Sequence, residues 1–307
     1  MKKLLIVFVF ISQVSIAQKA TLFLPDFFKD FPNVRDFSLS SNQDEMYFTV
    51  ESYLKEYSFI VFSKKVNGKW QTPETVSFSG QHKDLEPFLS PDGLKLFFAS
   101  NRINNTSSEI KKDIDIWFVT RTSTSSKWSS PKSVGAEINT SADEFYPSVN
   151  KNGDLFFTAQ YENSKGKEDI YVSRFVNNTY TKPISLNTNI NSEKYEFNAF
   201  VAPDESFIIF TAYGRKDDLG RGDLYISKKD KNNNWLPAEH LKNNINSNRI
   251  DYCPFVDTKT NTLYFTSSRT EIPKHFISKK TLKEALNYIN SNPNGLSRIY
   301  HVSLNKK

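Results

Sequence analysis

Carboxylate side chains recur along this sequence at a spacing of roughly 50–60 residues, a period typical of repeat proteins. Each stands near the start of a short segment rich in aromatic residues. Acidic side chains that converge on one point could bind a cation, an amine or a basic peptide. Two of them could also supply the acid and the nucleophile or base of a glycoside hydrolase, which lie about 5–9 Å apart. The candidates are Asp36, Asp84, Glu86, Asp143, Glu144, Glu196 and Asp251.

Three arginines follow three of these carboxylates at a similar distance along the chain: Arg102, Arg215 and Arg269. In a structural role, each carboxylate would accept hydrogen bonds from backbone N–H groups or pair with one of these arginines. The acids recur in register with the repeat, whereas a catalytic pair usually breaks such symmetry, so the pattern favours the structural role. We also expect the acids and arginines together to shape a binding surface.

The elements that must position these groups are clearest in the copy that begins at Asp84. A first strand ends at the turn formed by residues 90–93, where proline presets the turn and glycine tolerates a positive φ. A second strand over residues 94–99 is dense in leucine and phenylalanine. A third follows at residues 115–120, and a fourth ends near Val134. Four short strands of this kind form one blade of a β-propeller.

The same phrase returns five times, so the sequence predicts an all-β fold, a five-bladed β-propeller of four-stranded blades. Aromatic residues that recur once per copy, such as Trp70, Tyr180 and Trp235, are expected to pack between neighbouring blades. A stacking platform for bases or sugars is the alternative interpretation of these aromatics. The copies begin at Asp36, Asp84, Glu144, Glu196 and Asp251.

The two ends of the chain predict how the ring closes. The last copy ends at residues 301–305, after its third strand, and is one strand short. Residues 20–25 resemble a fourth strand that precedes the first copy. We expect this N-terminal strand to pair with the last blade, because that pairing removes an open sheet edge. Residues 18–307 would then form a single propeller domain.

Alternating strand direction fixes the end of the ring at which each loop lies. The links from second to third strand share one end with the links between blades, and the tight turns lie at the other. We therefore expect the recurring carboxylates to surround one mouth of the central channel, among loops of the kind that carry function on rigid scaffolds. The long loops at this mouth are residues 101–112, 160–168, 214–222 and 270–298.

One segment breaks the repeat. Thr281 is followed three positions later by Glu284, which is the pattern of a helix capping box. Apolar residues from Leu282 to Ile289 then follow helical spacing. The sequence predicts a short helix over residues 281–290, inserted in the last blade. This helix is either a lid packed on that blade or an element that docks a partner.

Residues 1–17 have the pattern of a signal peptide. Lys2 and Lys3 precede an apolar run over residues 4–11, and residues 15–17 are a small-residue cleavage pattern. The apolar run is too short to span a bilayer comfortably, and no later segment approaches the length that a membrane span needs. We expect an exported protein of a Gram-negative bacterium, located in the periplasm or outside the cell, with no membrane span after cleavage.

Charge, cysteine content and motif spacing exclude several classes of protein. The formal charge of +6 is spread along the chain and does not indicate a nucleic-acid-binding surface. The single cysteine, Cys253, cannot form an intramolecular disulfide and is expected to be a buried, inert thiol. The four histidines lack metal-type spacing, so we expect no metal site and no cofactor. We expect the protein to be a monomer.

Several repeat motifs resemble a known family. They are the Ser-Pro-Asp-Gly turn followed by Leu and Phe, the Asp-Ile-Trp and Asp-Ile-Tyr strands at Asp115 and Asp169, and the terminal strand from Gly295 to Tyr300. From Thr21 onward the chain resembles the TolB-like, WD-repeat-like propeller repeats of exported bacterial proteins. This resemblance implies a propeller fold and a family that includes protein-binding modules.

Two functions remain open from the sequence. The first is a non-catalytic, exported binding module for a protein, peptide or glycan of the cell envelope, which would use the loop-rich mouth. The second is a carbohydrate-active enzyme, a hydrolase or a lyase, with catalytic carboxylates at the same mouth. The acids available to that enzyme are Asp84, Glu144, Glu196 and Asp251.

Overall fold

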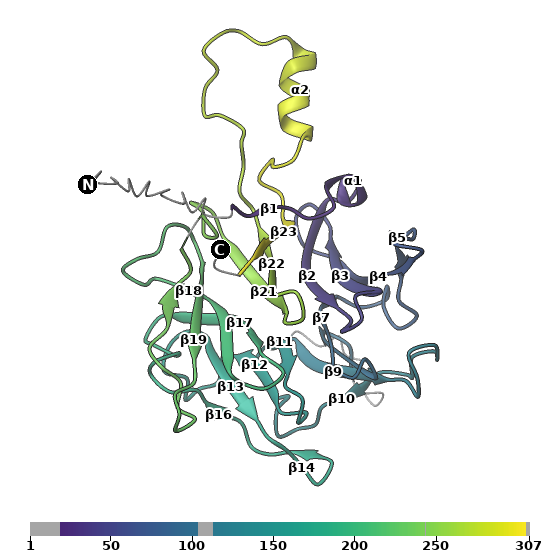
Figure 1. Ribbon diagram of the computed structural model, residues 1–307, viewed down its shortest axis with the longest axis vertical. Helices are drawn as coiled ribbons and strands as arrows, with labels where there is room; N and C mark the ends of the chain where they lie inside the picture. Colours follow the sequence, from purple (N-terminus) through teal and green to yellow (C-terminus); the bar gives the residue numbers. More distant parts are fainter. Residues whose placement is uncertain (1–18, 104–112, 243, 305–307) are drawn as a thin grey trace, which may run out of the picture.

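A computed structural model describes residues 19–103, 113–242 and 244–304 and arranges them as five antiparallel sheets in a ring (Figure 1). This confirms the predicted five-bladed β-propeller. The predicted signal peptide and most of the predicted loop at residues 101–112 lie outside the described residues. No helix in the described part of the chain is long and apolar enough to cross a membrane.

In blades 1 to 4 the innermost strand comes first in the chain and the outer strands follow. Blade 5 also begins with its innermost strand, but its outermost strand comes from the first described residues of the chain. Blade 1 consists of β2 (Asn33–Leu39), β3 (Glu45–Glu51), β4 (Ser58–Val66), β5 (Lys69–Trp70) and β6 (Glu74–Thr75). Blade 2 consists of β7 (Asp84–Leu89), β8 (Lys95–Ser100), β9 (Asp115–Thr120) and β10 (Lys132–Ser133). Blade 3 consists of β11 (Glu144–Val149), β12 (Leu155–Ala159), β13 (Asp169–Ser173) and β16 (Ile184–Ser185).

Blades 4 and 5 follow the same plan. Blade 4 consists of β17 (Tyr195–Val201), β18 (Phe207–Tyr213), β19 (Asp223–Lys228) and β20 (Glu239–His240). Blade 5 consists of β21 (Asp251–Asp257), β22 (Thr262–Ser267), β23 (Arg298–Ser303) and β1 (Thr21–Leu22). Outside the blades, the described residues form the hairpin of β14 (Phe175–Val176) and β15 (Thr179–Tyr180), and the helices α1 (Pro25–Phe28) and α2 (Leu282–Asn290).

Closure of the ring by the N-terminal strand is confirmed. β1 is antiparallel to β23, with Thr21 opposite His301 and Leu22 opposite Tyr300. The next residue continues this pairing, because the Phe23 amide donates to the Ile299 carbonyl at 2.9 Å. The Phe23 ring also lies 5.2 Å from the Phe37 ring of blade 1 and 5.0 Å from the Tyr264 ring of blade 5. Backbone pairing and aromatic packing therefore join the first blade to the last.

Aromatic and charged side chains pack between neighbouring blades. Trp128 of blade 2 lies 6.3 Å, ring to ring, from the buried Tyr47 of blade 1. The Arg121 guanidinium lies over the Trp128 ring and pairs with Glu45 of blade 1 at 2.6 Å. Cation–π and ionic contacts thus support the apolar core at this interface. The expected packing role of the once-per-blade aromatics is seen here.

Each innermost strand has the same irregularity, which decides what reaches the axis. The register against the second strand shifts in all five blades, and within each shift one residue has a positive φ of 49–60°. The five equivalent residues are Asp36, Glu86, Tyr146, Asn198 and Cys253. The predicted alignment of Asp36 with Asp84 is therefore wrong by two residues. Asp36 is equivalent to Glu86, and Val34 takes the place of Asp84.

The predicted helix at residues 281–290 forms as α2, with the expected capping box between Thr281 and Glu284. No residue of α2 is buried, and Figure 1 shows the helix far from the blades at the end of a long link. The interpretation of this helix as a lid packed on the last blade is therefore wrong. Helix α1 was not predicted, and its Phe28 packs 5.1 Å from Phe48.

Candidate binding site in the central channel

We call the end of the ring that carries the links between blades the link face, and the end that carries the tight turns the turn face. Three of the predicted carboxylates lie at the link face and pair with the predicted arginines. The pairs are Asp84 with Arg102 at 2.6 Å, Glu196 with Arg215 at 2.9 Å, and Asp251 with Arg269 at 2.6 Å. All three carboxylates are fully buried. The structure therefore brings each acid to its own arginine instead of gathering the acids in a common site.

Each of these pairs also fastens one blade to the segment that precedes it. The arginines donate to backbone carbonyls just before their blade, as Arg215 does to Ile190 at 2.6 Å and Arg269 to Ile245 at 2.6 Å. Serines of the same segments donate to the acids, for example Ser247 to Asp251 at 2.7 Å. A buried acid with a cation and hydroxyl donors is a satisfied structural group. These contacts fit the structural role that the repeat pattern favours.

Hydroxyl and backbone N–H groups donate to the carboxylates of the third blade. Glu144 accepts hydrogen bonds from the backbone amide of Thr140 at 3.0 Å and from the Thr140 hydroxyl at 2.5 Å. The neighbouring Asp143 accepts from the backbone amide of Ile114 at 2.8 Å. Both acids therefore anchor the loops that lead into blade 3.

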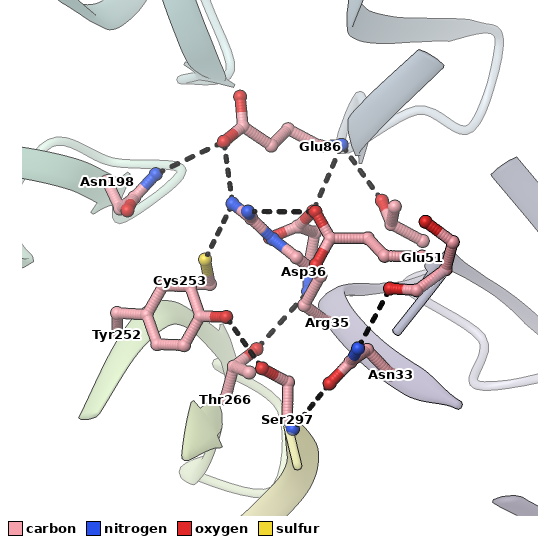
Figure 2. Close-up of polar contacts among 12 residues, drawn as sticks. Asn33, Arg35, Asp36, Glu51, Glu86, Asn198, Tyr252, Cys253, Thr266 and Ser297 are labelled. Atoms are coloured by element: carbon pink, nitrogen blue, oxygen red, sulfur yellow. Dashed lines mark hydrogen bonds and ion pairs between the residues drawn. The ribbon is translucent and has the colours of Figure 1, made fainter. Parts of the chain in front are cut away.

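Only Asp36 and Glu86 among the predicted acids reach the channel axis, where a third carboxylate, Glu51, joins them (Figure 2). Arg35 is their common partner. Its guanidinium lies 2.7 Å from Asp36, 2.8 Å from Glu86 and 3.4 Å from Glu51. It also approaches the sulfur of Cys253 at 3.5 Å. We call these five residues the axial cluster.

Glu86 is the member of the axial cluster that spans the channel. One of its oxygens accepts from the Tyr146 amide at 2.7 Å, and the other accepts from the Asn198 side chain at 3.4 Å as well as from Arg35. Burial raises the pKa of Glu86 to about 8, although Arg35 lowers it in part. Asp36 adds to the rise, because two like charges side by side disfavour ionisation.

The axial cluster is closed on the link-face side. Phe145, Phe197 and Ile250 are half-buried and pack against the buried Tyr146 and Tyr252. Asp36 is only 1% exposed and Glu86 only 4%. The predicted mouth of carboxylates is therefore a filled, largely dry cross-section of the channel.

The raised pKa of Glu86 predicts a pH-dependent stability. The folded state holds this proton more tightly than the unfolded chain, where the carboxyl has its ordinary value near 4.5. Stability from this source is complete below about pH 4.5 and is lost as the pH rises toward 8. Relative to Glu86→Gln, which is neutral throughout, the wild type should lose up to roughly 4 kcal/mol of unfolding free energy between pH 5 and 9.

Urea unfolding of both proteins across this pH range measures that difference directly. Glu162→Gln is the matched control, because Glu162 is an exposed glutamate of a loop in blade 3. Its difference from the wild type should not vary with pH. Parallel pH profiles for the wild type and Glu86→Gln would contradict the prediction.

An open pocket lies at the other end of the channel, at the turn face. Its empty volume, open mouth included, is about 520 Å³. Three phenylalanines from three blades meet there, with ring centroids 5.4–6.2 Å apart. The phenylalanines are Phe88, Phe200 and Phe255. Valines and leucines of the innermost strands line the walls, and Ser41, Ser90 and Lys259 stand among the residues of the rim.

Sequence reasoning missed this pocket, although a signal for it exists. Phe88, Phe200 and Phe255 hold equivalent places, each immediately after the register shift of its innermost strand. Blades 1 and 3 have Ser38 and Ser148 there, and these hydroxyls accept from the amides of the neighbouring blade's strand. A phenylalanine at one fixed place in three copies could have predicted an aromatic channel floor.

Among the described residues, no group of three or more His, Cys, Asp or Glu side chains is placed to hold a metal ion.

The comparisons with known proteins agree with a propeller. An α-L-arabinofuranosidase from Lactobacillus brevis matches at 14% identity over 90% of this chain and 93% of its own, with a TM-score of 0.51. The catalytic domain of an α-L-arabinofuranosidase from Coprinopsis cinerea matches at 8% identity over 94% and 96%, with a TM-score of 0.53. A putative TolB from Agrobacterium tumefaciens matches at 12% identity over 89% and 90%, with a TM-score of 0.49.

These likenesses concern the fold alone, because the identities are so low. No model of a protein family matches the chain, and no curated protein matches it. The propeller is used by carbohydrate hydrolases among the similar structures, so the fold does not decide between a binding module and an enzyme. Membership of the TolB-like repeat family stays a prediction.

Proposed function

We propose that this protein is a non-catalytic binding module, exported to the bacterial cell envelope, that binds a protein or peptide at the turn-face pocket. The observation that carries the proposal is the contrast between the two ends of the channel. At the link face Asp84, Glu196 and Asp251 are buried and paired with arginines, whereas at the turn face an apolar pocket is open. Pockets lined by apolar side chains with a few polar groups at the rim are the usual form of a ligand site.

The chemistry of the pocket favours a peptide over a glycan. Phe88, Phe200 and Phe255 are at least nine-tenths buried, so they offer a sugar ring no broad aromatic face. An apolar side chain would instead fill the space above them. The exposed Lys259 at the rim is suited to pair with a carboxylate next to that side chain. In this proposal the predicted acids and arginines serve the site by holding the blades in place.

Selection from a displayed random-peptide library tests the proposal. Enriched peptides should carry a large apolar residue next to an acidic one. Ser41→Trp should block the rim and weaken their binding by at least about tenfold, because Ser41 is an exposed rim residue and a bulky side chain there would occupy the entrance. Lys231→Glu, at an exposed hairpin turn in blade 4, is the matched control and should leave the affinity unchanged. Peptides that bind Ser41→Trp as well as the wild type would contradict the pocket as the site.

A carbohydrate-active enzyme is the second candidate, and one observation favours it. A buried carboxyl whose pKa is raised, next to a second carboxylate, is the arrangement that supplies a general acid in glycoside hydrolases. Here Glu86 and Asp36 have that arrangement, whereas Asp84, Glu144, Glu196 and Asp251 are engaged in structural contacts. A substrate could reach Glu86 only if Phe145 and Phe197 moved.

A hydrolysis screen separates the two candidates. We expect no turnover of arabinosides, xylosides or envelope glycans by the wild type. Turnover that both Glu86→Gln and Asp36→Asn abolish, with Glu162→Gln fully active, would replace the binding module with the enzyme.

A further inference from the structure

The link between β22 and β23 is a projecting arm, which we define as residues 270–297. Its base is held together: Thr270 forms a β-bridge with Asn294, and the Glu271 amide donates to the Pro293 carbonyl at 3.0 Å. Arg298, at the start of β23, donates to the side chain of Asn292 at 2.9 Å. Beyond this base the arm leads away from the ring and carries α2 at its far end (Figure 1). The arm is therefore an ordered element with a definite direction.

The far end of the arm exposes an apolar surface. Ile277 in the loop before α2 is fully exposed, Leu282 is 76% exposed and Ile289 is 56% exposed. Leu286 lies on the same face of the helix, and all of these side chains lack a buried environment. The Phe276 ring packs 4.9 Å from the Tyr288 ring and ties the loop to the helix. Exposed apolar surface of this kind marks an interaction site.

The same region is strongly basic. Lys274, Lys279, Lys280 and Lys283 surround the apolar side chains, and all are exposed or half-buried at the surface. Glu284 is the only acid between residues 272 and 290, and its carboxylate is engaged with Thr281 in the capping box. Between residues 272 and 290 the arm therefore presents apolar side chains among four lysines and a single glutamate, which interacts electrostatically with Lys280.

We propose that the arm binds the surface of an anionic lipid bilayer. An interfacial helix combines an apolar face with lysines that reach the charged headgroups, and the arm has both. The apolar side chains come from the loop as well as the helix, so they cover more than the single stripe that a protein groove would need. Tyr288 is of a residue type that is enriched at the membrane interface, and Phe276 adds to the apolar surface of the arm. This inference is independent of the turn-face pocket.

Co-sedimentation with lipid vesicles tests the proposal. We expect binding to vesicles with 30% phosphatidylglycerol in phosphatidylcholine, and little binding to phosphatidylcholine alone. Lys279→Glu/Lys280→Glu should reduce the anionic binding at least tenfold, because each lysine near such a surface contributes about fivefold. Ile277→Asp/Leu286→Asp should reduce it by a similar factor. The experiment uses both the chain of 307 residues and a chain that begins at Gln18. Comparing the two distinguishes binding by the apolar run at residues 4–11 from binding by the arm.

The controls match the variants in chemistry but lie elsewhere. Val176→Asp alters an exposed apolar residue of the β14–β15 hairpin, and Lys231→Glu reverses an exposed lysine of blade 4. Both should bind vesicles as the wild type does. Because no residue of α2 is buried, the arm variants should keep the thermal midpoint of the wild type. Binding that the arm variants leave unchanged would overturn the proposal. A dimer that these variants dissociate, without any vesicle binding, would overturn it in favour of a second copy of the chain.

Discussion

Replacement of Arg35 by methionine is expected to destabilise the protein by about 3–5 kcal/mol. Arg35 is the partner of three carboxylates at the axis, and its side chain is only 12% exposed. Without the guanidinium, the Asp36 and Glu51 carboxylates would be left without their cation in a dry cross-section of the channel, next to Glu86, which holds a proton at pH 7. The cost of uncompensated buried charge is far larger than the net value of the ion pairs themselves.

Urea unfolding at pH 7 measures this loss. Arg174→Met is the matched control, because Arg174 also pairs with two carboxylates, Asp154 and Glu205, but its side chain is 42% exposed. Its loss should stay below about 1 kcal/mol. The double variant Arg35→Met/Asp36→Asn should recover part of the stability, since one of the two stranded carboxylates is then a neutral amide. Equal losses for Arg35→Met and Arg174→Met would show that the axial cluster tolerates an uncompensated charge.

Deletion of residues 19–24 is expected to cost at least about 3–5 kcal/mol, the range for the loss of one buried aromatic side chain alone. The deletion removes β1, the hydrogen bond from the Phe23 amide to Ile299, and the Phe23 ring between blades 1 and 5. It also leaves β23 as an unpaired edge strand, so the truncated protein should aggregate at lower temperature. Thermal unfolding monitored with light scattering measures both effects.

A partly buried phenylalanine elsewhere provides the comparison for this deletion. Phe175 lies in the β14–β15 hairpin, with its ring 5.0 Å from Tyr180, and has no part in ring closure. Phe23→Ala should therefore destabilise the protein more than Phe175→Ala does. A truncated protein that keeps the midpoint and solubility of the full chain would mean that the ring does not depend on β1.

The architecture could be predicted from the sequence because its signals are local and repeated. Each copy carries its own turn residues and strand pattern, so the number of blades follows from counting the copies. Closure of the ring could be predicted because the last copy lacks its fourth strand, whereas the start of the chain has one strand too many. The ion pairs that Asp84, Glu196 and Asp251 form with their arginines could also be predicted, because each acid and its arginine recur together in the sequence.

The details of the axis could not be predicted, because a register shift leaves no composition signal of its own. One extra residue in a strand changes which side chains face the channel. Asp36 was assigned to the place of Asp84 for another reason: blade 1 has Val34 at that place, and Asp36 is the next acid along the chain. The role of Arg35 was missed for a related reason. Its partners Glu51 and Glu86 lie on different strands and blades, and only the closed ring brings them together. The turn-face pocket likewise exists only where five strands converge.

The chain contains a single thiol, and the fold places it where the first and last blades face each other. Cys253 is fully buried, in contact with Arg35 across that junction. Burial also raises the pKa of this thiol well above its ordinary value, which keeps it unreactive while the axis is intact. A thiol-specific reagent can therefore reach the sulfur only after the axis has opened. The rate at which Cys253 reacts would therefore report local opening of the native state. It would do so at the junction of blades 1 and 5, which lie farthest apart in the sequence.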